Sequence, residues 1–479
     1  MAFLTEAANR GSISTGYDID YSLKLEPDNS ESLTYTGTQS SAGNAKTWTW
    51  SGWIKRTELN AHTYLFSAGY TGFQFMGTEN WLRLELYNGS STYYLDLDMT
   101  FRDTSAWYHI VGQVDTTQAT AADRVKIWIN GVLQTEFRSS TNYTNISQNA
   151  EFQIGKTGSS ANWLKVGDWY AGGRYLAAYI AEWHYTDGVA NDADAFGEFD
   201  ASGIWKPIEY KGSYGTNGYY LDFSDSANLG DDANGSFSFT EGNITAADQA
   251  TDTPTNNFCT LNLQVPNYVN TGGATEGGTK IPYSGVNHYG AWYGTQGFTK
   301  GKWYWEAYIP SRSSSYGLSN EMGVHTMENN VLGSPYYANA FKTSYYLNFH
   351  YGYTYAWDSG TKASKNSEDG FPDLGTSAVG KWVGLAFNAD DGEATWYLDG
   401  TQTGNANLDI YDLHDKMQEG KFAVPFFQVY HNDLNVNFGG YSSQAISSGN
   451  TDANGYGNFE YAVPSGYYAI CTKNLAEFG

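Results

Sequence analysis

The chain contains 479 residues, of which 17% are aromatic and 16% charged, and its formal net charge is −25 at pH 7. Its 26 basic residues are spread without clusters, which argues against binding to nucleic-acid phosphates or to an anionic membrane surface. No run of 18 apolar residues occurs, and Met1 to Glu6 lacks the basic and apolar parts of a signal peptide, so we expect neither membrane insertion nor export by the usual route.

Length and composition predict an all-β protein with two domains. A single hydrophobic core rarely extends over so many residues, so two domains of roughly 200 residues each are expected. Tyr, Trp and Thr favour pleated, half-buried surfaces, and the 54 glycines serve turns and bulges. Helical periodicity is scarce, and residues 189–199 are among the few that favour a short helix.

Residues 1–30 form a polar lead-in that is rich in Ser, Asp and Gly and contains only short alternating pieces. Two interpretations stay open for this segment. It is either a first strand followed by a surface loop, or a docking arm that attaches the chain to a larger assembly.

Residues 31–224 carry the patterns of a first β-sandwich. In residues 47–56, alternation places Trp48, Trp50, Gly52 and Ile54 on one face of a strand. Short strands separated by Gly, Asn or Asp are typical of a sandwich or jelly roll. Further strands of this kind are predicted at residues 63–67, 81–86, 92–97 and 107–114.

Two tight hairpins give the strongest local signals. Apolar residues alternate from Val125 to Ile129, Asn130-Gly131 follows, and residues 132–137 run back. The same order recurs in residues 394–401, with Asp399-Gly400 at the turn. Asn-Gly and Asp-Gly tolerate the positive φ angles of two-residue hairpins, so pattern and turn chemistry agree.

Residues 225–257 are rich in Asp, Asn, Gly, Ser and Thr, which predicts a connector between the two modules. Residues 258–479 then form the second module. In residues 301–310, Trp303, Trp305, Ala307 and Ile309 share one strand face, and residues 380–400 give a strand, an Asp-Asp-Gly turn and a second strand.

The first module resembles a known family. SAGNAKTWTWSGWIKR, FRDTSAWYHIVGQVDTT and RVKIWINGVLQTEF are similar to the laminin-G or concanavalin-A-like lectin/glucanase sandwich, and most closely to the version found in virion proteins of tailed bacteriophages. YIAEWHYTDG and GSYGTNGYYLDFSDSANLG match the end of that phage module. The resemblance covers about residues 30 to 250 and implies an antiparallel jelly-roll sandwich.

The second module resembles a SPRY (B30.2-like) sandwich over about residues 258 to 475. GKWYWEAYIP, EMGVHT, GKWVGLAFNADDGEATWYLDG and LNVNFGG carry this resemblance. Loops at one end of SPRY domains bind partners. Residues 337–355 of this chain are unusually rich in Tyr, so the position of a partner surface does not transfer from other SPRY domains.

Catalytic motifs are missing from the sequence. Glycoside hydrolysis needs two carboxylates about 5 to 10 Å apart, and the glucanase string Glu-x-Asp-x-x-Glu does not occur. Asp96 and Asp98 have one-face spacing without a third acid, and we interpret both as solvent-facing. No Gly-x-Ser-x-Gly elbow, P-loop or dinucleotide fingerprint is present, and His109 is interpreted as a structural residue. The sequence predicts no enzyme and no catalytic residues. A hydrolase would need a carboxylate pair brought together from different strands.

Two loops resemble calcium-binding strings without completing one. Asp232, Asn234, Gly235 and Glu241 occupy EF-hand-like positions behind Gly230, and Asn450, Asp452, Asn454 and Gly455 precede Glu460 by an imperfect spacing. Such strings usually form Asx turns, so no cofactor is required and calcium stays open. The two cysteines, Cys259 and Cys471, flank the second module and are either two buried thiols or one disulfide.

An aromatic strand in residues 346–360 is the candidate ligand site. If it is extended, Tyr351, Tyr353, Tyr355 and Trp357 share one face beside Asp358. Flat aromatic faces stack on sugars and are enriched in protein interfaces. A core or subunit contact, a protein interface and a glycan site are the three interpretations of this strand.

The leading hypothesis is a non-enzymatic virion protein on the particle surface of a tailed phage, made in the host cytoplasm. It would be a tail-fibre or tail-associated adhesin that binds host-surface glycan or protein and contacts other virion proteins. Capsid decoration or a head fibre is the first alternative, and a lectin or glycoside hydrolase is the second. Phage architecture alone leads us to expect a homo-oligomer, since no heptad repeat supports one.

Overall fold

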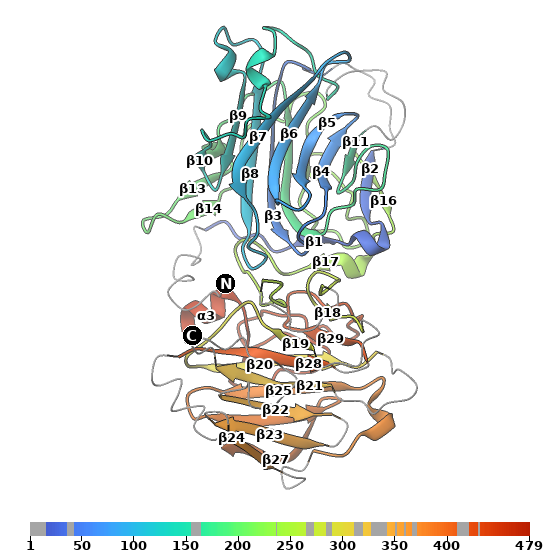
Figure 1. Cartoon of the computed structure of the whole chain (residues 1–479), viewed down its shortest axis with the longest axis vertical. Coiled ribbons are helices and arrows are strands. Elements are labelled where there is room, and N and C mark those ends of the chain that lie inside the picture. The colour runs from blue at the N-terminus through green and yellow to red at the C-terminus, as the bar shows by residue number, and fades with distance from the viewer. Residues whose placement is uncertain are drawn as a thin grey trace. The chain divides into compact units, whose positions relative to one another are not determined.

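The structure is a computed structural model that describes residues 16–35, 43–154, 164–235, 237–264, 273–283, 290–310, 320–326, 343–349, 352–358, 361–365, 371–409, 421–429 and 432–479. The chain divides into two compact units, whose main segments are Ser14–Thr255 and Asn256–Gly479 (Figure 1). Each unit contains two large sheets. The outer face of a sheet is defined here as the face turned away from the core of its unit.

The described residues of the first unit form sheet A with eight strands and sheet B with seven. In spatial order sheet A contains β10 (Val132–Leu133), β9 (Val125–Ile129), β8 (Tyr108–Asp115), β3 (Thr47–Arg56), β12 (Ala178–Asp187), β1 (Ser22–Leu25) and β17 (Gln249–Ala250), with β15 (Tyr219–Leu221) paired to β12. Sheet B contains β16 (Phe239–Gly242), β2 (Ser32–Tyr35), β11 (Leu164–Val166), β4 (Thr63–Ala68), β5 (Thr71–Met76), β6 (Trp81–Tyr87) and β7 (Thr92–Thr100).

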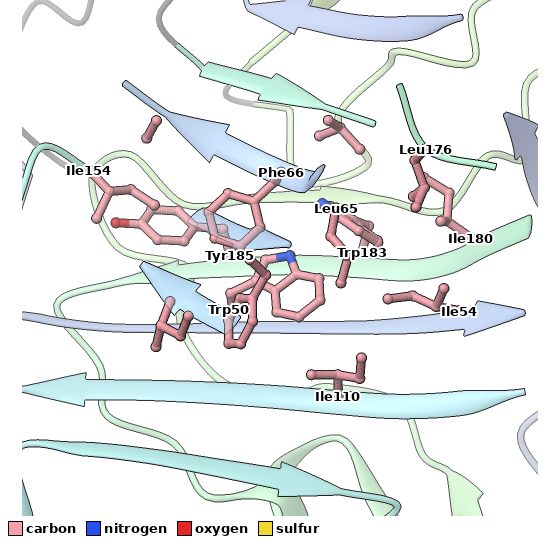
Figure 2. Close-up of a cluster of buried hydrophobic side chains, with 14 of the residues drawn as sticks. Trp50, Ile54, Leu65, Phe66, Ile110, Ile154, Leu176, Ile180, Trp183 and Tyr185 are labelled. Carbon is pink, nitrogen blue, oxygen red and sulfur yellow. The ribbon is translucent and has the colours of Figure 1, made fainter. Parts of the chain in front are cut away.

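Aromatic side chains of both sheets meet in the core of the first unit. The Trp50 ring of β3 lies 5.2 Å from Phe66 and 4.9 Å from Phe73 of sheet B, and 4.8 Å from Trp183 of β12 (centroid to centroid; Figure 2). A Cβ atom at Gly112 of β8 would lie only 2.4 Å from the Phe73 ring, so glycine permits this close approach. The predicted inward face of residues 47–56 is therefore confirmed.

The described residues of the second unit form sheets C and D. Sheet C contains β18 (Lys280–Ile281), β29 (Leu434–Asn437), β20 (Lys302–Tyr308), β25 (Trp382–Asn388), β26 (Glu393–Leu398) and β27 (Thr401–Asp409), with β30 (Tyr468–Ala469) parallel to β20. Sheet D contains β19 (Gly290–Tyr293), β28 (Ala423–Val429), β21 (Glu321–Thr326), β22 (Thr343–Asn348), β23 (Tyr353–Asp358) and β24 (Thr361–Lys365). Trp303 and Trp305 of sheet C lie with Phe427 of sheet D in the core of the second unit. The prediction of tandem antiparallel β-sandwiches is confirmed.

Both predicted hairpin turns are present. Asn130 and Gly131 have φ angles of 48° and 76°, and Asp399 and Gly400 have φ angles of 46° and 74°. Two consecutive positive φ angles are those of a type I′ turn, which matches the twist of the flanking strands. After the first turn, however, β10 ends at Leu133, because the chain crosses to sheet B and Phe137 bridges to Leu97.

The prediction of a short helix in residues 189–199 is wrong. The structure has a 3₁₀ turn, η4 (Ala193–Ala195), followed by β13 (Gly197–Phe199), which pairs with β14 (Trp205–Pro207). Ala193 and Phe196 pack against Val111 and Trp128 on the outer face of sheet A. This segment covers a second, smaller core, so its tertiary contacts override the weak helical pattern. Sequence patterns also missed β5 entirely.

The expected lead-in and connector both contribute strands to the first unit. β1 lies within residues 1–30 and pairs with β12, whereas residues 1–15 are outside the described residues. Within residues 225–257, β16 pairs with β2 and β17 pairs with β1. The structure therefore assigns most of the expected connector to the first sandwich, where backbone pairing holds it.

The two cysteines lie near the place where the ends of the second unit meet. The N–H of Cys259 donates to the Ile470 carbonyl at 3.0 Å, next to Cys471 at the start of α3 (Thr472–Phe478). Both thiols are free and buried, so the disulfide alternative is not adopted. In the described part of the chain, no helix combines the length and apolar character that crossing a bilayer requires.

Candidate ligand-binding face of the first unit

The outer face of sheet B combines aromatic and polar side chains. On β6, Leu82, Leu84 and Leu86 are buried in the core. Because side chains alternate along a strand, Arg83 and Glu85 point to the opposite face, where both are half-buried. Tyr64 of β4, Gln74 of β5 and Tyr87 of β6 share that outer face.

A chain of hydrogen bonds crosses this face from Arg174 to Glu85. The Arg174 Nη1 donates to His62 Nδ1, His62 Nε2 lies 2.5 Å from Gln74 Oε1, and Gln74 Nε2 donates to Glu85 Oε2 at 2.7 Å. A guanidinium only donates and an amide oxygen only accepts, so His62 is neutral and carries its proton on Nε2. The Tyr64 hydroxyl donates to the same Glu85 oxygen at 3.1 Å.

The surroundings shift the pKa of His62 and that of Glu85 in this chain of bonds. Burial lowers the pKa of His62, and the charges of Arg174 and Arg83 lower it further, although the bond to Gln74 raises it. Burial raises the pKa of Glu85 and outweighs the donors Gln74 and Tyr64 and both arginines. His62 is therefore held neutral beside the guanidinium of Arg174.

Arg174 belongs to residues 167–176, which we call the aromatic loop. The buried Asp168 organises this loop, because its Oδ1 accepts the backbone N–H groups of Trp169 at 2.8 Å and Arg174 at 3.0 Å. Gly172 and Gly173 both have positive φ angles, which allow the chain to reverse between Trp169 and Arg174. The loop is thus pinned at two points around one carboxylate.

The aromatic loop contributes two rings to a group of four, which we call the aromatic group. The Tyr70 ring centroid lies 4.9 Å from that of Tyr170 and 5.2 Å from that of Tyr87, and Trp169 lies 5.1 Å from Tyr170. Tyr70 is 43% exposed, and the other three are half-buried. Exposed aromatic rings beside polar groups can stack on a sugar ring while the polar groups bond its hydroxyls.

The prediction that Asp96 and Asp98 both face solvent is wrong for Asp96. Asp96 is fully buried, and Arg83 donates to both of its oxygens, with Nε–Oδ1 at 2.7 Å and Nη2–Oδ2 at 2.8 Å. The Ser140 hydroxyl also donates to Oδ2, because residues 138–142 pass over this part of β7. Asp96 therefore has no free oxygen with which to form a catalytic pair with Glu85 on the adjacent strand.

His109 is a structural residue, as predicted. Its Nδ1 lies 2.9 Å from the indole N–H of Trp205, which can only donate, and its Nε2 lies 2.8 Å from the Ser51 hydroxyl. Burial lowers the pKa of His109 to about 3. Nε2 of the neutral ring therefore carries the proton, and the ring cannot remove a proton from Ser51.

A second titratable cluster is closed off on the outer face of sheet A. The Glu182 carboxylate accepts hydroxyl bonds from Tyr17 at 2.8 Å and Tyr220 at 2.6 Å, and lies 3.3 Å from His184 Nε2. The Tyr214 hydroxyl lies 2.9 Å from His184 Nδ1. Glu182 and His184 are almost completely buried, so the partners of both groups are internal.

The two loops considered for calcium use their carboxylates in turns. Asp232 accepts the backbone N–H groups of Tyr220, Asn234 and Phe237. Asp452 accepts those of Asn454, Tyr456 and Ala469. Over the described residues, no group of three or more His, Cys, Asp or Glu side chains could hold a metal ion.

The predicted aromatic strand is partly described. Residues 353–358 form β23, so this part is extended as expected, and Tyr353 is half-buried. Residues 346–348 belong instead to β22, which pairs antiparallel with β23, so residues 346–360 are not one continuous strand. Tyr351 and the side chains of Tyr355, Trp357 and Asp358 lie outside what the structure describes. A ligand site on this strand stays a prediction.

Sequence patterns missed the groups that form the face of sheet B. Asp168, Trp169 and Arg174 lie in the string GDWYAGGR, whose glycines predict a turn without indicating its partners. Two neighbouring aromatic residues between glycines were the available signal, since binding residues are common on loops held by a rigid scaffold.

Several solved structures are similar to parts of the chain at low identity. The chain is similar to a Bacteroides ovatus protein described as carbohydrate-binding (14% identity, TM-score 0.32), with 47% of this chain and 58% of that protein covered. It is also similar to the PSpry domain of TRIM65 (13%, TM-score 0.27; 39% and 90% covered) and to the carbohydrate-binding module CBM66 from Bacillus subtilis (11%, TM-score 0.23; 37% and 92% covered).

The sequence comparisons identify one domain. No curated protein matches the chain. Residues 28–194 match a laminin-G-type family model described as the concanavalin A-like lectin/glucanases superfamily. These residues include most strands of sheets A and B, so the similarity to this family covers most of the first sandwich.

Proposed function

We propose that this chain is a non-catalytic, glycan-binding adhesin on the surface of a tailed-phage particle, as a tail-fibre or tail-associated protein. The observation that carries the binding role is the aromatic group beside the hydrogen-bond chain from Arg174 to Glu85. The match of residues 28–194 to a lectin/glucanase superfamily supports the same class of ligand. The sequence resemblance to phage virion proteins supports the location.

A binding role fits the chemistry of this face better than hydrolysis. Both oxygens of Asp96 are occupied, whereas Glu85 accepts two bonds on Oε2 and, among the described residues, receives no donor on Oε1. A single available carboxylate oxygen can accept a sugar hydroxyl, but glycoside hydrolysis needs two carboxylates. Release of sugars from a polysaccharide panel by the purified chain would replace this proposal with a hydrolase.

The remaining parts of the proposal concern assembly. Other virion proteins are the expected partners on the particle, the chain is made in the host cytoplasm, and a homo-oligomer is expected. The strand with Tyr351, Tyr353, Tyr355, Trp357 and Asp358 is retained as a second surface for host glycan or protein.

Glycan binding is tested on an array of host-type polysaccharides with a matched pair of variants. Tyr70→Ala removes the most exposed ring of the aromatic group, and we expect it to weaken binding about 5- to 100-fold, as loss of a stacking contact does. Tyr21→Ala is the control, because Tyr21 is similarly exposed (36%) but precedes β1 in sheet A. Equal binding by both variants would exclude the aromatic group as the site.

Location is tested by immunogold labelling of intact virions with an antibody to this chain. We expect label at the tail or at fibre tips. Label over the whole head, at high copy number, would instead identify a capsid decoration protein. Absence of label from every virion would remove the phage assignment and leave a lectin.

A further inference from the structure

Two arginines on the outer face of sheet B differ in how their guanidinium groups are used. Arg83 pairs its Nε and Nη2 edge with the two oxygens of Asp96, at 2.7 and 2.8 Å. This fork is the strongest arrangement that an arginine makes with a planar, two-oxygen anion. The requirement of Arg83 for an anion is therefore satisfied within the chain.

Arg174 has no such partner among the described residues. Its side chain bonds His62 through Nη1 and lies over the Trp169 ring, whose centroid is 5.6 Å from the guanidinium carbon. No ion pair involves it within the described residues, and its Nε and Nη2 edge makes no hydrogen bond there. The charge is nevertheless positioned, because Asp168 and the backbone N–H of Tyr64 hold the Arg174 backbone on both sides.

Among the described residues no carboxylate forms a hydrogen bond with this edge, although the charge of Arg174 acts on the Glu85 carboxylate of the same face. Asp168 is the closest acid in sequence, but its Oδ1 accepts two backbone N–H groups and its Oδ2 accepts the Lys165 ammonium at 2.9 Å. His62 is neutral and occupies only Nη1. A half-buried guanidinium with a free two-donor edge, next to rings that can stack on a sugar, matches a sugar that carries its own anionic group.

We infer that the face of sheet B selects anionic sugars, with Arg174 reading a carboxylate or sulfate group while the aromatic group stacks on the sugar ring. This inference rests on the proposed glycan binding and specifies its ligand class. The net charge of −25 does not oppose it, because charges more than about 8 Å away are screened at physiological salt, whereas Arg174 would touch the ligand.

The experiment measures the affinity of the full chain for matched sugars by calorimetry in about 0.15 M salt. The probes are short oligomers of galacturonate, mannuronate and glucuronate, each beside its carboxyl-reduced neutral form and a sulfated version of that neutral form. We expect an anionic form to bind about 10- to 100-fold tighter than its neutral counterpart, as a charge-assisted fork does. The carboxylated and sulfated arms show which anion is read.

Variants assign that preference to Arg174. Arg174→Gln removes the charge and should lower the affinity for anionic oligomers to that for their neutral forms. Arg174→Lys keeps the charge without the fork and should retain part of the preference. Arg138→Gln is the control, since Arg138 also lies over an aromatic ring, Trp81, but is paired with Glu79 at 2.6 Å. Melting curves confirm that each variant is folded.

The outcomes separate this inference from the proposed function. Neutral oligomers binding as tightly as anionic ones would overturn the inference and leave glycan binding intact. An anionic preference that survives Arg174→Gln would also overturn it, because another group would then read the charge. If no oligomer binds, glycan binding itself fails at this face, and the inference fails with it.

Discussion

The two sheets of the first unit use their outer faces in opposite ways. On sheet A, chain segments cover much of the face, and the two buried lysines Lys55 and Lys24 are paired: Lys55 with Asp252 at 2.6 Å, and Lys24 with Glu31 at 3.1 Å and Asp248 at 2.8 Å. On sheet B, Tyr70 is exposed and Arg174 has no carboxylate partner among the described residues. Both faces are rich in charged and aromatic residues, so residue type alone does not distinguish them.

The difference shows how burial decides the role of a charge. A charged group under a covering segment is desolvated and needs a partner inside the chain. A charged group on an open face stays solvated and is accessible to a ligand. The outer face of sheet C gives a third case. There the buried Glu306 accepts only neutral donors: Tyr304 and Asn437 side chains and the backbone N–H groups of Glu460 and Tyr461.

The largest effect is expected where a covered ion pair loses one partner. Lys55→Met leaves Asp252 buried without its cation, and we expect the unfolding free energy of the first unit to fall by about 3 to 5 kcal/mol. Urea denaturation followed by tryptophan fluorescence measures this. Lys211→Met is the control, because Lys211 is 80% exposed and its pair with Glu209 contributes little. A loss as small as that of the control would show that the cover of sheet A is not held by this pair.

A pH effect of similar size is expected in the second unit. Burial raises the pKa of Glu306 to about 7 from its ordinary 4.5, and outweighs the four donors that lower it. The folded unit therefore binds more protons than the unfolded chain between these values. The contribution of this group to the unfolding free energy is fully present below pH 4.5. It is lost as the pH rises through about 7, by roughly 3 kcal/mol in total.

The variant Glu306→Gln removes this titration. We expect its unfolding free energy to stay level between about pH 5 and about pH 8, where the unmodified chain becomes less stable. Denaturation of both proteins across that range measures the difference. A parallel pH dependence in the two proteins would mean that another group is responsible.

An intermediate effect is expected where a buried carboxylate organises an open face. Asp168→Asn keeps one acceptor oxygen but loses the charge that holds Lys165 and two backbone N–H groups. We expect a loss of about 1 to 3 kcal/mol and a larger loss of glycan affinity, because the aromatic loop no longer holds Trp169 and Arg174 in place. Thermal melting and calorimetry measure the two losses. Unchanged affinity in a folded variant would contradict this role of Asp168.

The smallest stability effects are expected on the open face itself. Tyr70→Ala and Arg174→Gln should each change the unfolding free energy by less than about 0.5 kcal/mol, as surface substitutions usually do, while reducing ligand affinity. Chemical denaturation measures the stability term. A loss above 2 kcal/mol in either variant would place that side chain among the structural residues and remove the contrast between sheets A and B.

Local patterns predicted the elements that depend on neighbouring residues. Alternation and turn chemistry located β3, β20 and both Gly-containing hairpins, because side-chain period and positive φ are properties of a few consecutive residues. They failed where distant contacts decide. Residues 189–199 do not form the predicted helix because they pack on the outer face of sheet A. Asp96 is buried because residues 138–142 cover it.

The sequence by itself determined the all-β class, the tandem sandwiches and the absence of familiar catalytic motifs, since these follow from periodicity, composition and spacing. Only the tertiary structure decided which charges are buried and which are open. Arg174, His62, Gln74 and Glu85 come from four separate places in the chain and meet only when sheet B forms. The charge and hydrogen bonding of these side chains depend on residues that are distant in sequence, so no local sequence pattern predicts them.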